Sequence, residues 1–467
     1  SSPTAVPARR FVYQCILSLY QSILPPLAMR AARARRVKAC PEGEKASAMV
    51  VCVDALCSVC SEKLSSDHDG VRCAASKDDR PRLLIAAIGG DAEEVAALLA
   101  EPGIDVNASD EEGAIALIEA VRQGLNQGHA EQVVAALLAS PSIDVNAATR
   151  EGHTALMFAA EKGYTEIVAA LLASPSIDVN AATREGHTAL MSAADKGYTE
   201  IVAALLASPG IDVNASDEEL GFTALLLAAS LGYTEVVAAL LASPGIDVNQ
   251  EAGSHHSNHT ALSRAAENGH TTVVAALLAA PGIDVNATNA TDPEFVCTAL
   301  IWAADNGHTE VVAALLAVPG IDANAAARDG STALTGAANA GYTEVVAALL
   351  AVPGIDVNAA ARGGSTALTG AAYAGYTEIV AALLAAPGID VNAAARDGST
   401  ALTGAAYAGY TEIVAALLAA PGIDVNAADE EGHTALIKAT GKDYTEIVAA
   451  LLASPGIERR MWAESRE

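Results

Sequence analysis

Four residues near the N-terminus have the side chains of a metal site. Cys57 and Cys60 are separated by two residues, and His68 and Cys73 follow further along the chain. Cysteine thiolates and imidazoles are the ligands that hold zinc in a tetrahedral site. The intervals between these four residues do not complete a regular zinc motif. We therefore interpret them as free thiols of a reducing compartment and keep zinc binding as the alternative.

Other residues that could carry chemistry lack the partners that the chemistry needs. His255, His256 and His259 share one turn, which we interpret as an exposed loop rich in Ser, Asn and His. Gly441 and Lys442 lack the preceding glycine and the following Ser or Thr of a phosphate-binding loop. No Ser-His-Asp, Cys-His or paired-carboxylate set stands apart from the rest of the sequence. We therefore expect no enzymatic activity, no cofactor and no bound metal.

The charge of the chain is unevenly distributed. Residues 1–78 carry 11 basic and 7 acidic side chains, whereas the remainder carries 16 basic and 49 acidic ones, for a total net charge of −29. An acidic surface disfavours the phosphate backbone of nucleic acids. We expect no nucleic-acid binding, and a basic protein as the better electrostatic match.

The N-terminal segment has a composition of its own. Residues 1–41 contain seven Arg or Lys and no acidic residue, and residues 11–24 are mostly apolar. That apolar stretch is shorter than the roughly 20 residues that span a bilayer. Organelle targeting, membrane contact and an unstructured segment all remain open for it. We expect a cytoplasmic protein, with membrane contact by this segment as an alternative.

One sequence unit recurs through most of the chain. Its period is close to 34 residues, which is typical of a supersecondary unit stacked many times. The asparagine of an Ile-Asp-Val-Asn motif marks the period at Asn107, Asn146, Asn180, Asn214, Asn249, Asn286, Asn324, Asn358, Asn392 and Asn426. In one such unit, Thr154 is a good N-cap for a helix over residues 155–162, and Gly163 ends that helix. Thr165 is expected to cap a second helix, which stops at Pro175.

The unit resembles the ankyrin repeats. The matching residues are Gly152, Thr154, Leu156, Ala159, Ala160, Gly163, Val168, Leu171, Leu172, Asp178, Val179 and Asn180. The family's Pro and His at the start of the first helix are Ala155 and Met157 here, which predicts looser helix starts. The resemblance implies an all-α, elongated and curved helix-turn-helix solenoid with short β-turn fingers. About eleven repeats would occupy residues 79–458, between an N-terminal region (1–78) and a polar tail (459–467).

The resemblance also implies where a partner binds. Ankyrin repeats bind proteins on the concave side, which is formed by the turn tips and the exposed positions of the first helices. Here the variable residues at those positions are Phe158, Lys162, Lys196, Leu227, Arg264, Trp302, Asp305, Asn339, Tyr373, Tyr407 and Lys438. Trp302, Tyr373 and Tyr407 are the expected anchors, because exposed aromatic residues often dominate interface energetics. Drift at unconstrained exposed sites predicts the same variability.

The predicted function is protein–protein recognition by a monomeric scaffold. Helices of two to three turns are unstable alone, so neighbouring repeats must bury their apolar sides together and leave one face free. Two alternatives stay open. One is an adaptor whose N-terminal cysteines recruit ubiquitin-transfer machinery through zinc, and the other is a scaffold tethered to a membrane by the N-terminal segment.

Overall fold

The chain folds into pairs of short antiparallel helices that follow one another in sequence order. The computed structural model describes residues 82–123, 127–252, 259–288 and 297–457, and these helices all belong to the unit Asp79–Glu467. The first helices of the pairs are α3 (Arg82–Gly89), α5 (Ala116–Gln123), α7 (Ala155–Lys162), α9 (Ala189–Lys196), α11 (Ala224–Leu231), α13 (Ala261–Glu267), α15 (Ala299–Asp305), α17 (Ala333–Ala340), α19 (Ala367–Ala374), α21 (Ala401–Ala408) and α23 (Ala435–Gly441).

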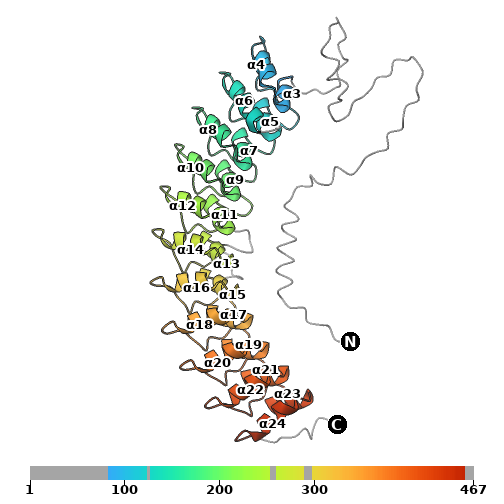
Figure 1. Ribbon diagram of the computed structural model, residues 1–467, viewed down its shortest axis with the longest axis vertical. Coiled ribbons are helices and arrows are strands. Elements are labelled where there is room, and N and C mark those ends of the chain that lie inside the picture. Colours follow the sequence, from blue (N-terminus) through green and yellow to red (C-terminus); the bar gives the residue numbers. More distant parts are fainter. Residues whose placement is uncertain (1–81, 124–126, 253–258, 289–296, 458–467) are drawn as a thin grey trace, which may run out of the picture. The chain divides into compact units, whose positions relative to one another are not determined.

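Each second helix begins three or four residues after the end of its first helix. They are α4 (Ala92–Leu99), α6 (Gln127–Leu138), α8 (Thr165–Leu172), α10 (Thr199–Leu206), α12 (Thr234–Leu241), α14 (Thr271–Leu278), α16 (Thr309–Leu316), α18 (Thr343–Leu350), α20 (Thr377–Leu384), α22 (Thr411–Leu418) and α24 (Thr445–Ala453). First helices form one row and second helices a parallel row, so the array is an all-α solenoid (Figure 1).

Several predicted features lie outside the described residues. They are the cysteine and histidine set Cys57, Cys60, His68 and Cys73, the basic N-terminal segment, and the tail 459–467. The lengthened turns around residues 253–258 and 289–296 lie outside them as well.

The predicted ends of the first helix are confirmed in α7. The Oγ1 of Thr154 accepts a hydrogen bond from the backbone N–H of Met157 (3.4 Å), which satisfies one of the unpaired donors of the first turn. Gly163 ends the helix at φ +77°, in the left-handed region that glycine adopts without strain. The prediction for Thr165 is wrong. The turn at Gly163 is so tight that Thr165 is already the first residue of α8, with Tyr164 before it and no side-chain cap.

The looser helix starts expected from the missing Pro and His stay a prediction, although hydrogen bonds cap these starts. A threonine caps the first helix in every repeat from Thr154 to Thr434, without the family's histidine. In α17, α19 and α21 the residue that replaces this histidine is itself a threonine. The Oγ1 of Thr369, for example, accepts a hydrogen bond from the N–H of Thr366 (2.8 Å), while the N–H of Thr369 donates back to Thr366 Oγ1 (3.3 Å). This reciprocal capping box satisfies two helix-end donors at once.

The hydrophobic core runs through the whole array between the two rows of helices. In α8, Ile167, Val168 and Leu171 are fully buried, and the same three positions are buried in the other second helices from α10 to α22. Each first helix packs against the next first helix and against its own second helix. No pair could bury these side chains alone, so stability comes from stacking between neighbours.

Loops link each repeat to the next by a ladder of asparagine side chains. In one link, the Nδ2 of Asn358 donates to the carbonyl of Gly388 (2.8 Å), and its Oδ1 accepts from the N–H of Asp390 (2.8 Å). Asn358 is itself held by Asp356, whose Oδ1 accepts from its N–H (3.0 Å). The recurring Asp and Asn of the sequence motif are therefore structural, as turn chemistry predicts.

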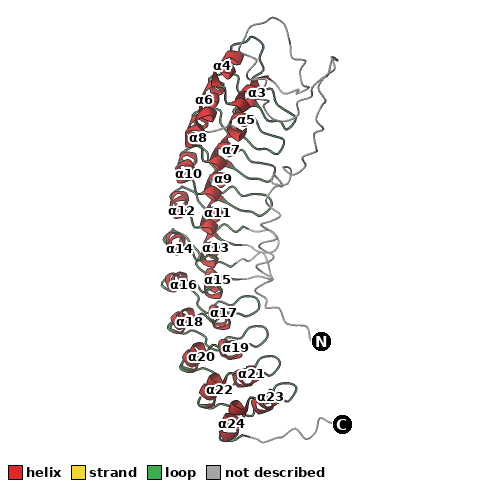
Figure 2. Ribbon diagram, turned by 45° about the vertical axis from the view of Figure 1, so that its right-hand side comes forward, coloured by secondary structure: helices red, strands yellow, loops and turns green. Residues whose placement is uncertain are grey.

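On the other side of the first helices, short loops form the predicted β-turn fingers, seen at the right in Figure 2. Fingers in the described ranges are closed by isolated antiparallel bridges, such as Ala360 with Thr366 and Ala394 with Thr400. Neighbouring fingers are joined by backbone hydrogen bonds, such as Arg396 N–H to Gly363 O (2.7 Å). The fingers and the first helices together form the surface on which the variable residues lie.

Candidate functional site

Three consecutive first helices carry a glycine where other repeats carry a larger side chain. Gly336, Gly370 and Gly404 occupy the same position in α17, α19 and α21 that Trp302 occupies in α15. A Cβ atom at Gly370 would overlap the side-chain amide of Asn339 from the preceding helix. A Cβ atom at Gly404 would lie 3.7 Å from the nearest atom of Tyr373. The glycines thus let side chains of one repeat lie on the helix of the next.

A groove of about 410 Å³ follows two of these glycines, Gly370 and Gly404, and is lined by residues of α17, α19, α21 and α23. Its floor is formed by Gly370 and Gly404. Tyr373 and Tyr407, which are 61% and 43% exposed, also line it. Its other lining residues are Asn339, Ser365, Thr369, Ala374, Ala395, Asp397, Ser399, Thr400 and Lys438. We call this feature the tyrosine groove. It brings together four of the residues singled out in the sequence, namely Asn339, Tyr373, Tyr407 and Lys438.

One end of the tyrosine groove is held by an ion pair. Lys438 Nζ lies 2.9 Å from Asp429 Oδ2, and both side chains are largely buried. Burial opposes the ionisation of Asp429. The hydrogen bonds from Lys438 and from the His433 N–H, together with the charges of these two residues, outweigh burial and lower the pKa of the Asp429 carboxyl. Lys438 and Lys442 also lie 5.9 and 4.7 Å from the ring centre of Tyr407, within the range of a cation–π interaction.

Asp305 and Trp302 occupy the corresponding surface further towards the N-terminus. The side chain of Asp305 is exposed overall, but its carboxyl group lies against the backbone of Gly336. The resulting loss of water and the charge of Asp329 raise the pKa of Asp305 to about 6. Trp302, expected as an exposed anchor, is half-buried, and its Nε1 has no hydrogen-bond partner within the described ranges.

His259 does not lie in an exposed loop as expected. It is 2% exposed, and its ring lies 5.3 Å from that of Trp302. Burial and the charge of Arg264 lower the pKa of His259 to about 3. The sequence signal that could have shown this is its place directly before the capping residue Thr260, where Phe222 and Cys297 stand in the adjacent repeats.

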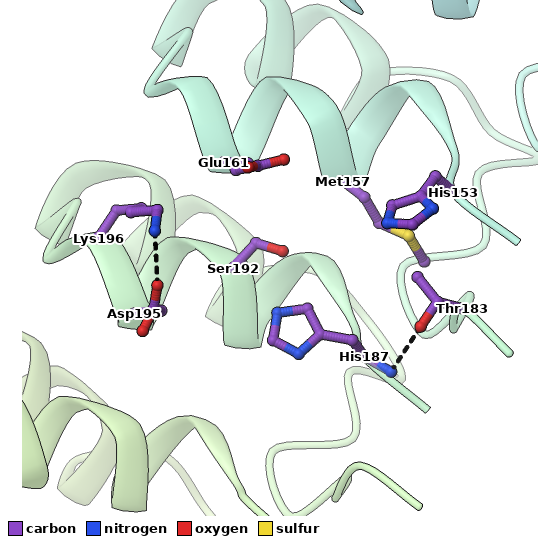
Figure 3. A pocket seen from close by; sticks show the side chains of 8 residues that line it. All are labelled: His153, Met157, Glu161, Thr183, His187, Ser192, Asp195 and Lys196. Atoms are coloured by element: carbon purple, nitrogen blue, oxygen red, sulfur yellow. Dashed lines mark hydrogen bonds and ion pairs between the residues drawn. The ribbon is translucent and has the colours of Figure 1, made fainter. Parts of the chain in front are cut away.

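A second, smaller pocket of about 170 Å³ lies between α7 and α9. Figure 3 shows that His153, Met157 and Glu161 come from one repeat and that the remaining residues come from the next. Its lining residues are His153, Met157, Glu161, Thr183, His187, Ser192, Asp195 and Lys196. Lys196 is paired with Asp195 at 2.7 Å, and burial lowers the pKa of His187. Among the predicted residues, only Lys196 lines this pocket.

The helix pairs, the capped starts and the joined fingers can now be compared with known families. The family model described as ankyrin repeats (3 copies) matches residues 125–217, 216–289, 300–395 and 368–460, which together are more than half of the chain. The chain belongs to the ankyrin repeat family. No curated protein matches it. The match supports the resemblance on which the interaction surface was predicted.

The remaining predicted residues lie on the ankyrin array outside both pockets. Phe158 stacks on His153 with ring centres 5.3 Å apart, and Leu227 is half-buried against the core. Arg264 pairs with Glu267 at 2.9 Å, and Lys162 is exposed near the ring of Tyr164. These residues therefore share helix positions with the tyrosine groove but do not extend it.

Sequence reasoning missed part of the tyrosine groove. It did not name the floor glycines Gly370 and Gly404 or the finger residues Ser399 and Asp397, and it considered Lys442 only as part of a phosphate-binding loop. Alignment of the repeats at their 34-residue period does contain a signal, because glycine replaces larger residues at the floor position. That position becomes a groove only when the neighbouring helix is in place.

Possible metal ligands are not clustered in the described part of the ankyrin array. Within it, no group of three or more His, Cys, Asp or Glu side chains is placed to hold a metal ion. None of its helices is both long and apolar enough to span a membrane. Ankyrin repeats are generally non-catalytic and bind proteins.

Proposed function

We propose that this ankyrin array is a non-catalytic scaffold that binds a partner protein in the tyrosine groove. The observation that carries the proposal is the pair of exposed rings, Tyr373 and Tyr407, at the same position of consecutive helices on a glycine floor. Tyrosine supplies a large contact area at low conformational-entropy cost, and aromatic residues are enriched among binding hot spots. The helices that hold these rings are packed on both sides, so little order has to be gained on binding.

The partner is expected to be a basic protein rather than a nucleic acid, because the array is strongly acidic. The array itself is proposed to comprise about eleven repeats and to act as a monomer in the cytoplasm. Predicted binding residues outside the groove, such as Lys162, Leu227 and Arg264, would contact a partner only if its interface extends along the first helices.

Cross-linking mass spectrometry can identify the partner, and the purified pair then tests the site. Tyr373→Ala and Tyr407→Ala should each weaken binding about tenfold, as is typical of an aromatic hot spot. Leu231→Ala is the matched control, because Leu231 is an exposed apolar residue of α11 outside the groove. Full affinity of the double Tyr variant, with its circular dichroism spectrum unchanged, would refute the site.

A further inference from the structure

The tyrosine groove is periodic in space. Residues 363–396 and 397–430 are identical at 31 of 34 positions, and residues 329–362 differ little from them. Their first helices, α17, α19 and α21, pack one on the next. Packed helix axes lie about 8–10 Å apart. The groove therefore presents nearly the same side chains to a ligand at intervals of about 10 Å.

The size of the groove favours an extended ligand over a helical one. An α-helix with its side chains is about 10–12 Å wide. The groove has a volume of only about 410 Å³, although its lining residues come from four helices and the fingers beside them. This volume suits a single extended chain, with individual side chains lying between the tyrosines, better than a helix with its side chains.

Two kinds of extended chain can be distinguished. A β-strand presents side chains on one face about every 6.6 Å and gains affinity by pairing with an open strand edge. The fingers in the described ranges contain only isolated bridges, and their backbone groups bond to neighbouring fingers. A polyproline II helix turns once in three residues, or about 9 Å, and its backbone needs no such partner. Its period matches the spacing of the tyrosines.

The side chains of the groove also suit proline. Flat aromatic rings that flank a narrow floor are the surface on which proline rings pack in known polyproline II recognition. Tyr373 and Tyr407 supply such rings, and Gly404 between them leaves room above the helix. A tyrosine hydroxyl can donate a hydrogen bond to a ligand carbonyl, which polyproline II leaves unpaired.

The surrounding charge selects the flanks of such a ligand. Residues 329–457 contain 13 acidic and only four basic side chains. One of these four, Lys438, is already paired with Asp429. We propose that the tyrosine groove binds a proline-rich segment of a partner protein in the polyproline II conformation, with basic residues on its flanks. This inference rests on the proposed function and specifies its partner.

A labelled synthetic peptide tests the inference on the full chain. The peptide has three Pro-Pro-Ala turns between paired arginines, and a control peptide carries Gly-Ser in place of each Pro-Pro. Fluorescence anisotropy should show saturable binding of the proline peptide, at least tenfold tighter than that of the control. Tyr373→Ala and Tyr407→Ala should each weaken it about tenfold. Tyr373→Phe should weaken it less, because only the hydroxyl is lost, and Leu231→Ala should leave it within about twofold.

The chain also permits a gain of binding. Asn339 occupies the position of Tyr373 and Tyr407 one repeat earlier, so Asn339→Tyr adds a third ring in register. This variant should bind the three-turn peptide about tenfold tighter and a two-turn peptide no tighter than wild type. If the variant bound the two-turn and the three-turn peptide with the same gain in affinity, the match between the polyproline II period and the tyrosine spacing would be overturned.

Other outcomes separate this inference from the proposed function. If the control peptide binds as well as the proline peptide, attraction between charges explains the binding and the inference is overturned. If the cross-linked partner depends on Tyr373 and Tyr407 but the proline peptide neither binds nor competes, the proposed function stands and this inference fails. If the partner is indifferent to both tyrosines, both fail.

Discussion

Single residues of this array act mainly on the repeat beside their own. Asn339 lies on Gly370, Asp305 lies on Gly336, and Tyr373 lies near Gly404, in each case one helix further along. A substitution at these glycines therefore tests contacts between repeats. Glycine inside a helix costs roughly 0.5–1 kcal/mol relative to alanine, and this sets the scale of the expected effects.

The floor glycines give a matched pair of substitutions. Gly404→Ala meets no atom closer than 3.7 Å, so it should stabilise the array by about 0.5–1 kcal/mol through helix propensity. Gly370→Ala places its methyl group on the Asn339 amide, so it should gain nothing or destabilise the array. Urea unfolding measures both. The double variant Asn339→Ala with Gly370→Ala should recover the gain, and equal stability of the two single variants would contradict the packing.

Asp305 should make stability depend on pH. Its pKa rises from 3.8 to about 6 on folding. The folded state therefore holds this proton more tightly, and the resulting stabilisation is complete below pH 3.8 and lost as the pH rises through 6. The free energy of unfolding of Asp305→Asn should equal that of the wild type near pH 4 and exceed it at pH 7. The difference should be about 1 kcal/mol or less, because solvent screens this exposed side chain.

The neighbouring repeat supplies the reciprocal experiment, because Asn339 already occupies the equivalent place on Gly370. Asn339→Asp should introduce a smaller loss of stability in the same direction between pH 4 and 7, because Gly363 stands where Asp329 adds its charge in the preceding repeat. Thermal unfolding across that range measures both variants. If the stability of Asp305→Asn and that of the wild type changed in parallel with pH, the pKa of the Asp305 carboxyl would not be raised by folding.

At the scale of elements, helices and loops contribute to stability in different ways. Each helix is only seven to twelve residues long, and its apolar side chains are covered by neighbouring helices. Loops add directional links, of which the asparagine ladder is the most regular. Each asparagine of the ladder from Asn107 to Asn392 donates to a carbonyl and accepts from an N–H of the next repeat, and Asn426 donates to the carbonyl of Gly456.

The ladder can be tested at Asn358, in the middle of the nearly identical repeats. Asn358→Ala removes both hydrogen bonds to the next repeat and should cost about 1–2 kcal/mol, since the residue is only half-buried. Asn358→Asp keeps the acceptor for Asp390 but loses the donor to Gly388, so it should also destabilise the array. Urea unfolding is the measurement, and no change in either variant would make the ladder a consequence of packing rather than a cause.

How much of these elements the sequence could predict depends on the range of the interactions involved. The ends of α7 followed from Thr154 and Gly163, because capping is local in sequence. The role of Thr165 was predicted wrongly because the backbone path of a tight turn decides which residue starts the helix. The burial of His259 and the floor at Gly404 depend on side chains about 30 to 45 residues away, which no local pattern contains.

For the whole molecule, the repeats behave as units that each contact only their neighbours. Stability is then approximately a sum of terms for units and for interfaces. Residues 363–396 and 397–430 are nearly identical. Removing or duplicating one of these two repeats therefore brings together repeat surfaces that already pack on each other. Whole-molecule properties should therefore change in steps of one repeat.

Deletion of residues 363–396 tests this additivity. The shortened chain should keep the helical circular dichroism per residue of the wild type, unfold cooperatively at a somewhat lower midpoint, and lose one of the two groove tyrosines. Deletion of residues 363–379 removes half a unit, breaks the register of the helix pairs, and should unfold the C-terminal repeats. Similar behaviour of the two deletions would contradict a stack of independent units.

The asparagine links have a mechanical consequence as well. Because each one joins only adjacent repeats, a load applied at the two ends would be carried by all links in series. Every link would feel the same tension, and the weakest junction would yield first, while the others stayed closed. Stretching a single molecule should therefore give a sawtooth of small, evenly spaced extensions, each close to the contour length of one 34-residue repeat.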